Sequence, residues 1–114
     1  MKVLILGIDG MIGHKIAQSL SNDFVLFGST RKNITIDAIG IKSCSLIHYD
    51  FLIEDNFYIF EQINPDVIIN CIGITTRRGA SLNASNTKQI NEDLPHKINQ
   101  WTTDNEKKLI HFST

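Results

Sequence analysis

The chain has 114 residues, of which 42% are hydrophobic and 20% charged, and this composition predicts one globular domain over residues 1–114 rather than a disordered or disulfide-rich chain. The formal net charge of −1 provides no general attraction to nucleic acid or an anionic membrane, so we expect a small-molecule partner. The apolar runs are too short to span a bilayer and no signal peptide is apparent, which predicts a cytoplasmic protein. Cys44 and Cys71 show no metal-ligand spacing and are expected to be free thiols, with no metal site.

Short apolar runs alternate with helical periods along the whole chain. The runs predict strands over residues 2–6, 24–27, 46–49, 67–71 and 109–112. Helical spacing predicts helices over residues 12–20, 53–63 and 90–101, with a kink or restart at Pro95. Residues 29–43 fit a strand, a short helix or an irregular segment equally, and residues 75–86 read as a loop. This alternation is typical of an α/β fold, and we expect a Rossmann-type doubly wound parallel sheet in the order 3-2-1-4-5 with right-handed crossovers.

Three glycines follow the first predicted strand and open the first predicted helix, in the run Gly7-Ile8-Asp9-Gly10-Met11-Ile12-Gly13. In a dinucleotide-binding turn the first glycine permits the turn, the second lets the backbone approach the pyrophosphate, and the third allows close packing of helix and strand. The anion then meets the positive end of the helix, beside Met11 and Ile12. A plain tight turn, or a flavin or other nucleotide site, would use similar residues.

The end of the second predicted strand reads Gly28-Ser29-Thr30-Arg31-Lys32 and contains no carboxylate. An acidic residue here binds the ribose 2′-hydroxyl of NAD, whereas an arginine accommodates the 2′-phosphate of NADP. Arg31 could grip that phosphate in a bidentate manner, and Ser29 or Thr30 could donate a hydrogen bond. We therefore expect NADP, with NAD possible, although a solvated basic pair is the alternative.

In this order, the motifs resemble those of the extended short-chain dehydrogenase/reductases, and among them the dTDP-4-dehydrorhamnose reductase-like group that acts on nucleotide sugars. The resemblance covers nearly the whole chain. It is carried by the glycine turn, Asp50, the run from Asn64 to Gly73, Asn91 with Leu94-Pro95, and His111-Phe112-Ser113-Thr114.

The resemblance implies a role for individual residues. Asp50 would bind the adenine amino group with Phe51 beside it, and Cys71-Ile72-Gly73 would run under the cofactor. Asn91 resembles a helix asparagine near the active site. Thr114 resembles the catalytic residue that holds the substrate carbonyl oxygen, with Ser113 as the second choice.

The chain departs from the family pattern because it has no YxxxK pair: four residues after Tyr49 and Tyr58 stand Ile53 and Gln62. The tyrosine of that pair handles the hydroxyl proton in the family. We therefore interpret the chain as an N-terminal fragment of an enzyme that reduces or epimerises a keto-sugar nucleotide, without turnover of its own. The alternative is a non-catalytic NADP-binding regulatory or scaffold subunit.

Other polar residues are weaker candidates. Asp9 would repel phosphates, and His14 is expected to be solvated on the first helical turn. The Arg77-Arg78 pair could clamp a diphosphate or be solvated. An uncovered fifth strand should expose Leu109 and Ile110 and promote a homodimer or other edge-to-edge association.

Overall fold

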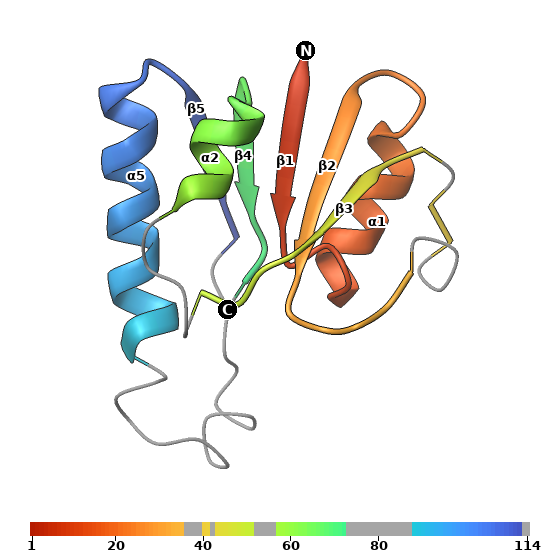
Figure 1. The fold of residues 1–114 in the computed structure, drawn as a ribbon, viewed down its shortest axis with the longest axis horizontal. Coiled ribbons are helices and arrows are strands. Elements are labelled where there is room, and N and C mark those ends of the chain that lie inside the picture. The colour runs from red at the N-terminus through yellow and green to blue at the C-terminus, as the bar shows by residue number, and fades with distance from the viewer. Residues whose placement is uncertain (36–39, 42, 52–56, 73–87, 113–114) are drawn as a thin grey trace.

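The computed structural model describes residues 1–35, 40–41, 43–51, 57–72 and 88–112 (Figure 1). Its centre is a five-stranded parallel sheet in the order β3-β2-β1-β4-β5. The strands are β1 (Lys2–Leu6), β2 (Val25–Thr30), β3 (Ser45–His48), β4 (Val67–Asn70) and β5 (Lys108–His111). The predicted fold class and strand order are therefore confirmed, and β1 has the predicted bounds.

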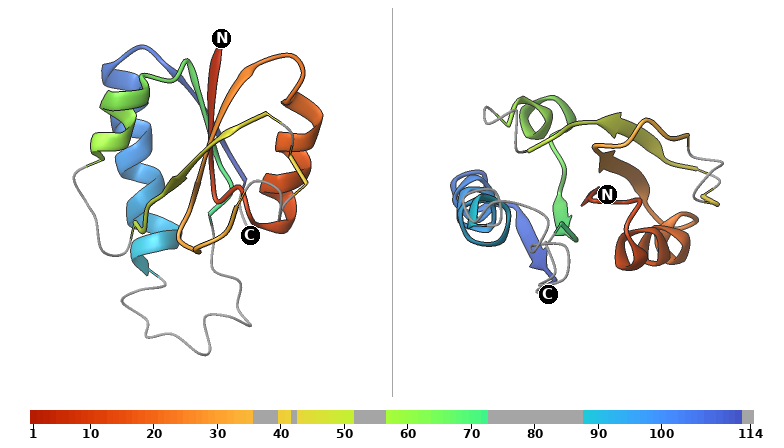
Figure 2. Two further views of the ribbon diagram at one scale, coloured as in Figure 1. Left: turned by 45° about the vertical axis from the view of Figure 1, so that its right-hand side comes forward. Right: turned by 90° about the horizontal axis from the view of Figure 1, so that it is seen from below.

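Helices cover both faces of the sheet. They are α1 (Met11–Leu20), α2 (Tyr58–Ile63), a π-helical turn η2 (Gln89–Asp93) and α5 (Leu94–Asp104). Figure 2 shows α1 on one side of the sheet, with α2 and α5 on the other. Among the described residues, no helix is long and apolar enough to cross a membrane.

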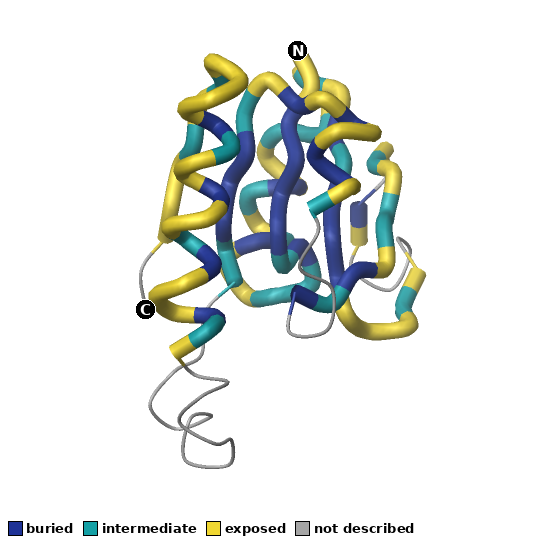
Figure 3. Tube along the Cα trace, turned by 60° about the vertical axis from the view of Figure 1, so that its left-hand side comes forward, coloured by how far each residue is buried: buried dark blue, intermediate teal, exposed yellow. Residues whose placement is uncertain are grey.

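The core consists of two apolar layers, one on each face of the sheet. Figure 3 shows the central strands mostly buried and the helices exposed along their outer sides. Along β1 the side chains alternate, so that Leu4 and Leu6 pack toward α2 and α5 while Val3 and Ile5 pack on the side of α1. This alternation explains why the strand reads as an almost continuous apolar run, because both of its faces are buried. The layer of α2 and α5 contains several aromatic rings that contact one another in tilted or edge-to-face geometry.

Strand β2 is longer than the sequence pattern indicates. It continues three residues past Phe27 because Ser29 pairs with Leu6 of β1 and Thr30 pairs with His48 of β3. The polar side chains at its end concealed a segment that is fixed by backbone hydrogen bonds on both sides. The extension places Arg31 directly after the carboxyl end of the strand.

The prolines mark helix boundaries as predicted. Asn64 ends α2 with a left-handed backbone (φ 50°) and donates its amide to Phe60 O at 2.8 Å, and Pro65 follows. Pro95 lies in the first turn of α5, directly after η2. Because proline has no amide hydrogen, it cannot donate to the carbonyl of Asn91, and the helix restarts there as expected. The predicted helical residues 53–56 lie outside the described residues.

Candidate dinucleotide site

The glycine turn between β1 and α1 is tied to both neighbouring strands. The amides of Gly7 and Ile8 both donate to Ser29 O of β2 at 3.0 Å. Gly7 has a φ of +76°, which favours glycine, and a Cβ there would come within 3.1 Å of Ile72 Cγ1 after β4. The turn therefore lies at the carboxyl edge of the sheet, against the ends of β2 and β4, where nucleotides bind in open α/β folds.

Gly13 and Gly10 differ in what surrounds them. A Cβ on Gly13 would overlap Gly7 O and lie 3.0 Å from Ile8 Cα, so this glycine allows α1 to pack on the turn. Among the described residues, a Cβ on Gly10 would meet one atom within 4 Å, Gly7 O at 3.3 Å. The second glycine therefore faces open space, as required where a pyrophosphate approaches the backbone.

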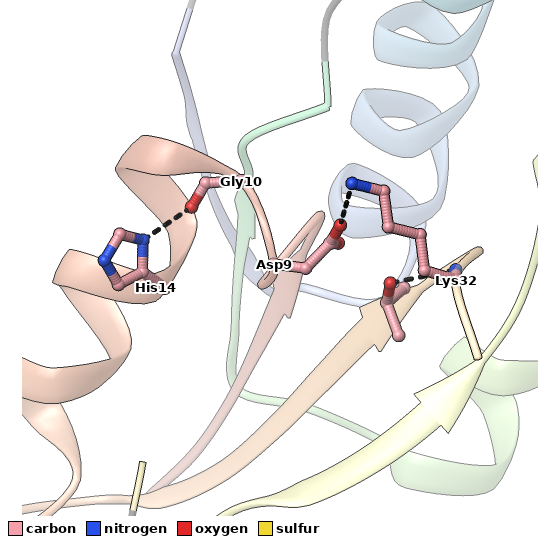
Figure 4. A network of polar contacts seen from close by, with 5 residues as sticks. Asp9, Gly10, His14 and Lys32 are labelled. Atoms are coloured by element: carbon pink, nitrogen blue, oxygen red, sulfur yellow. Dashed lines mark hydrogen bonds and ion pairs between the residues drawn. The ribbon is translucent and has the colours of Figure 1, made fainter. Parts of the chain in front are cut away.

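The first turn of α1 leaves its amides available to an anion. Gly10 is the N-cap, no side chain of the described residues caps the helix, and the first turn contains no acidic residue. Met11 and Ile12 are exposed there. His14, expected to be solvated, is partly buried and donates Nδ1–H to Gly10 O at 2.9 Å (Figure 4). Unpaired amides and the helix dipole make such an end suited to a phosphate group.

The end of β2 corrects one expected role. Ser29 is 1% exposed, so its hydroxyl is not accessible to a ligand, and its carbonyl instead holds the glycine turn. Thr30 is also buried, and its Oγ1 accepts the amide of Lys32 at 3.1 Å. The sequence pattern predicted that Ser29 or Thr30 could donate to a phosphate, because the strand was predicted to end before them. Arg31 and Lys32 are exposed.

Asp9 of the glycine turn forms an ion pair with Lys32 (Figure 4). Lys32 Nζ lies 3.6 Å from Asp9 Oδ2. The two side chains come from the turn after β1 and the segment after β2, so the pair bridges two segments of the candidate site. Sequence reasoning missed the pairing because its members are 23 positions apart and have no shared motif.

Around the candidate site, the segments that follow β3 and β4 contribute buried or partly buried side chains. The ring of Phe51 is buried against Tyr49 and Phe57, so Asp50, which is partly exposed, is the residue of the pair that a ligand can reach. Burial raises the pKa of the Cys71 thiol to about 11, which keeps it protonated near neutral pH. Ile72 lies against Gly7, since a Cβ on Gly7 would come within 3.1 Å of Ile72 Cγ1.

Two asparagines, Asn70 and Asn91, lie in different environments. Asn70 is fully buried at the end of β4 and accepts the amide of Ile72 at 3.1 Å, a role signalled by a polar residue ending an apolar strand. Asn91 is exposed in η2. Five candidate residues lie outside the described residues: Gly73, Arg77, Arg78, Ser113 and Thr114. Within the described part of the chain, no three His, Cys, Asp or Glu side chains gather as metal ligands do.

Solved structures share this architecture. L-threonine dehydrogenase from Clostridium difficile superposes with a TM-score of 0.81 at 18% identity over 96% of the chain and 35% of its own length. A hypothetical dTDP-4-dehydrorhamnose reductase from Sulfolobus tokodaii gives 0.76 at 19% identity over 97% of the chain and 38% of its own. UDP-glucose 4-epimerase from Thermotoga maritima gives 0.79 at 15% identity, over 97% and 37%.

These likenesses establish a Rossmann-type fold, and the chain spans little more than a third of the length of each solved structure. No curated protein matches the chain. The model of one family, described as the RmlD substrate binding domain, matches residues 1–114. The resemblance to the dTDP-4-dehydrorhamnose reductase-like group is thereby confirmed. The chain belongs to the RmlD substrate binding domain family.

Proposed function

We propose that the chain binds NADP and forms the cofactor-binding part of an oxidoreductase that reduces or epimerises a nucleotide sugar. The observation that carries the proposal is the glycine turn at the carboxyl edge of β1, with open space in front of Gly10. The residues present fit a dinucleotide, because the exposed first turn of α1 offers unpaired amides to the pyrophosphate.

Each half of the cofactor has residues suited to it. The pyrophosphate would meet the backbone of Gly10 and the first turn of α1, and the adenine would approach Asp50. Arg31 is exposed, and no described residue forms a salt bridge with its guanidinium, so it is available to a 2′-phosphate. When bound, the nicotinamide supplies hydride transfer, while this part of the chain binds and orients the cofactor.

The substrate class rests on the family and on the names of its structural neighbours. The chain belongs to the RmlD substrate binding domain family, and its fold is shared with a reductase and an epimerase named for nucleotide sugars. A cytoplasmic location belongs to the same proposal, since the described Cys44 and Cys71 are free thiols, as is usual in a reducing compartment.

Calorimetric titration of the chain with NADP and NAD tests this function. We expect tighter binding of NADP, and loss of both cofactors in Gly10→Val, because the added side chain fills the space that the pyrophosphate needs. Arg31→Ala should weaken NADP by about 1–3 kcal/mol and leave NAD nearly unchanged. Lys97→Ala, which removes an exposed cation from α5, is the matched control. Equal wild-type affinities, or equal losses for both cofactors in Arg31→Ala, would refute the NADP assignment.

A further inference from the structure

The ion pair between Asp9 and Lys32 lies after the second strand, where Rossmann proteins distinguish the 2′-hydroxyl of NAD from the 2′-phosphate of NADP. In Rossmann folds the residues after the second strand determine whether a 2′-hydroxyl or a 2′-phosphate is accepted. Lys32 stands two residues after the end of β2, and its amide is held by Thr30 Oγ1 at 3.1 Å. Its ammonium group points back across this position to the carboxylate of Asp9 in the glycine turn (Figure 4).

The side chains of Asp9 and Lys32 differ in how freely they can change conformation. The side chain of Asp9 is 16% exposed, whereas that of Lys32 is 63% exposed. Asp9 belongs to a turn that is fixed by hydrogen bonds from Gly7 and Ile8 to β2. Lys32 could therefore swing toward an incoming phosphate, but the carboxylate would remain in place beside it.

The charge of Asp9 has opposite consequences for the two cofactors. A phosphate monoester carries about −1.5 to −2 charges near neutral pH, so a 2′-phosphate would be repelled by the carboxylate and would compete with it for Lys32. The 2′-hydroxyl of NAD is uncharged and experiences neither effect. Within the described residues, Arg31 is the adjacent cation without a carboxylate partner.

We propose that Asp9 is a specificity-determining residue that limits the preference for NADP by holding Lys32 in an ion pair at the 2′-phosphate position. This inference rests on the proposed function, because it requires a nicotinamide cofactor at the glycine turn. It assigns Arg31 as the principal phosphate ligand and Lys32 as a second ligand that Asp9 withholds. The expected preference of the natural chain for NADP is correspondingly modest.

The test is calorimetric titration of NADP and NAD against the wild type, Asp9→Asn and the double variant Asp9→Asn/Lys32→Ala. Removing the carboxylate should tighten NADP by about three- to ten-fold, as expected for one partly screened charge, and leave NAD within about two-fold. In the double variant the gain should become smaller, because the contribution of the released lysine is lost while the relief of repulsion remains. The gain should also shrink in 1 M NaCl, which screens the interaction.

Two controls keep the result specific. Asp23→Asn makes the same change of charge on an exposed residue before β2, at the opposite edge of the sheet, and should leave both affinities unchanged. Asp9→Ser, which suits a turn, repeats the test should Asp9→Asn fail to unfold cooperatively on heating.

The outcomes separate this inference from the proposed function. If neither cofactor binds the wild type, both are overturned. If NADP binds the wild type and Gly10→Val abolishes that binding, while Asp9→Asn and Asp9→Ser leave NADP unchanged or weaken it, the function stands and the role of Asp9 is wrong. An equal gain in Asp23→Asn would likewise overturn the role of Asp9, because it would show a general effect of charge.

Discussion

Asn70 and His111 are joined across the β4–β5 pair by a hydrogen bond of 3.0 Å between Asn70 Nδ2 and His111 Nδ1. The amide oxygen of Asn70 accepts the backbone amide of Ile72, so its NH₂ group faces the histidine. Nδ1 of His111 is therefore the acceptor, and a neutral ring carries its proton on Nε2. His111 itself is exposed at the end of β5.

Replacing Asn70 with alanine should destabilise the fold. The change leaves the amide of Ile72 without its side-chain partner and opens a gap at a fully buried position, which costs about 1–3 kcal/mol for such a group. Urea denaturation measures the loss. His111→Ala, which removes only the exposed partner, is the control and should cost less than about 1 kcal/mol. Equal losses would show that the bond to His111, rather than the bond to Ile72, stabilises this edge.

Alanine should lower the stability of the fold at the third glycine and have little effect at the second. Gly13→Ala places a methyl group on Gly7 O, so we expect a loss of stability of about 1–3 kcal/mol or more from overpacking. Gly10→Ala meets one atom at 3.3 Å, and the extended backbone of Gly10 accepts a side chain, so stability should change little. Thermal unfolding of the two variants compares them directly. A larger loss in Gly10→Ala would contradict the packing described for this turn.

Ser29→Ala should leave stability unchanged or raise it by up to about 1 kcal/mol. The hydroxyl of Ser29 is buried and finds no hydrogen-bond partner among the described residues, and removing an unsatisfied polar group relieves its desolvation cost. Affinity for NADP should be unaffected, because the backbone carbonyl and not the hydroxyl holds the glycine turn. Loss of NADP binding in this variant, measured by calorimetry, would restore the role expected from the sequence.

Burial raises the pKa of both Cys44 and Cys71 from 9.0 to about 11. At pH 8 the folded chain should therefore hold about a hundred-fold less thiolate than free cysteine and react slowly with iodoacetamide. Between pH 9 and 11 the unfolded thiols ionise while the folded ones stay protonated, so the free energy of unfolding should fall as pH rises through this window. Mass spectrometry of native and urea-unfolded chain, labelled across this pH range, checks both sites. Equal labelling rates in the two states would contradict the raised pKa values.

The outer edge of β5 should promote self-association. Ile110 is 47% exposed, whereas Leu109, which was also expected to be uncovered, packs partly against the core. Ile110→Lys should shift sedimentation toward the monomer, since a lysine disfavours edge-to-edge pairing. Val25→Lys is the matched control, because Val25 is 55% exposed on β2, which is paired on both sides. A chain that stays monomeric at high concentration would contradict this prediction.

The fold could be predicted because local signals agreed along the chain. The doubly buried run of β1, the three glycines and the helix-ending Asn64-Pro65 each point to one local structure. Where residues are polar but held by strand pairing, as at Ser29 and Thr30, the sequence concealed the strand. Hydropathy records the environment of a side chain, and it contains no direct information on backbone pairing with distant strands.

The candidate site was only partly predictable for a related reason. The open face of Gly10 and the packed face of Gly13 follow from a motif in which neighbouring residues share one turn. The pairing of Asp9 with Lys32 and that of Asn70 with His111 join residues from different strands or turns, across distances in sequence that no local pattern spans. Such contacts depend on the register of the sheet, which only the folded structure specifies.

The central position of β1 in the sheet affects when the sheet can form during synthesis of the chain. This strand is synthesised before both of its neighbours, since Val3 pairs with Leu26 on one side and with Val67 on the other. Until β4 has been translated, one side of the most apolar strand has no neighbour and is open to other nascent chains. Folding of the sheet on the ribosome should therefore wait for β4, and a chaperone that shields β1 would have most effect before β4 emerges.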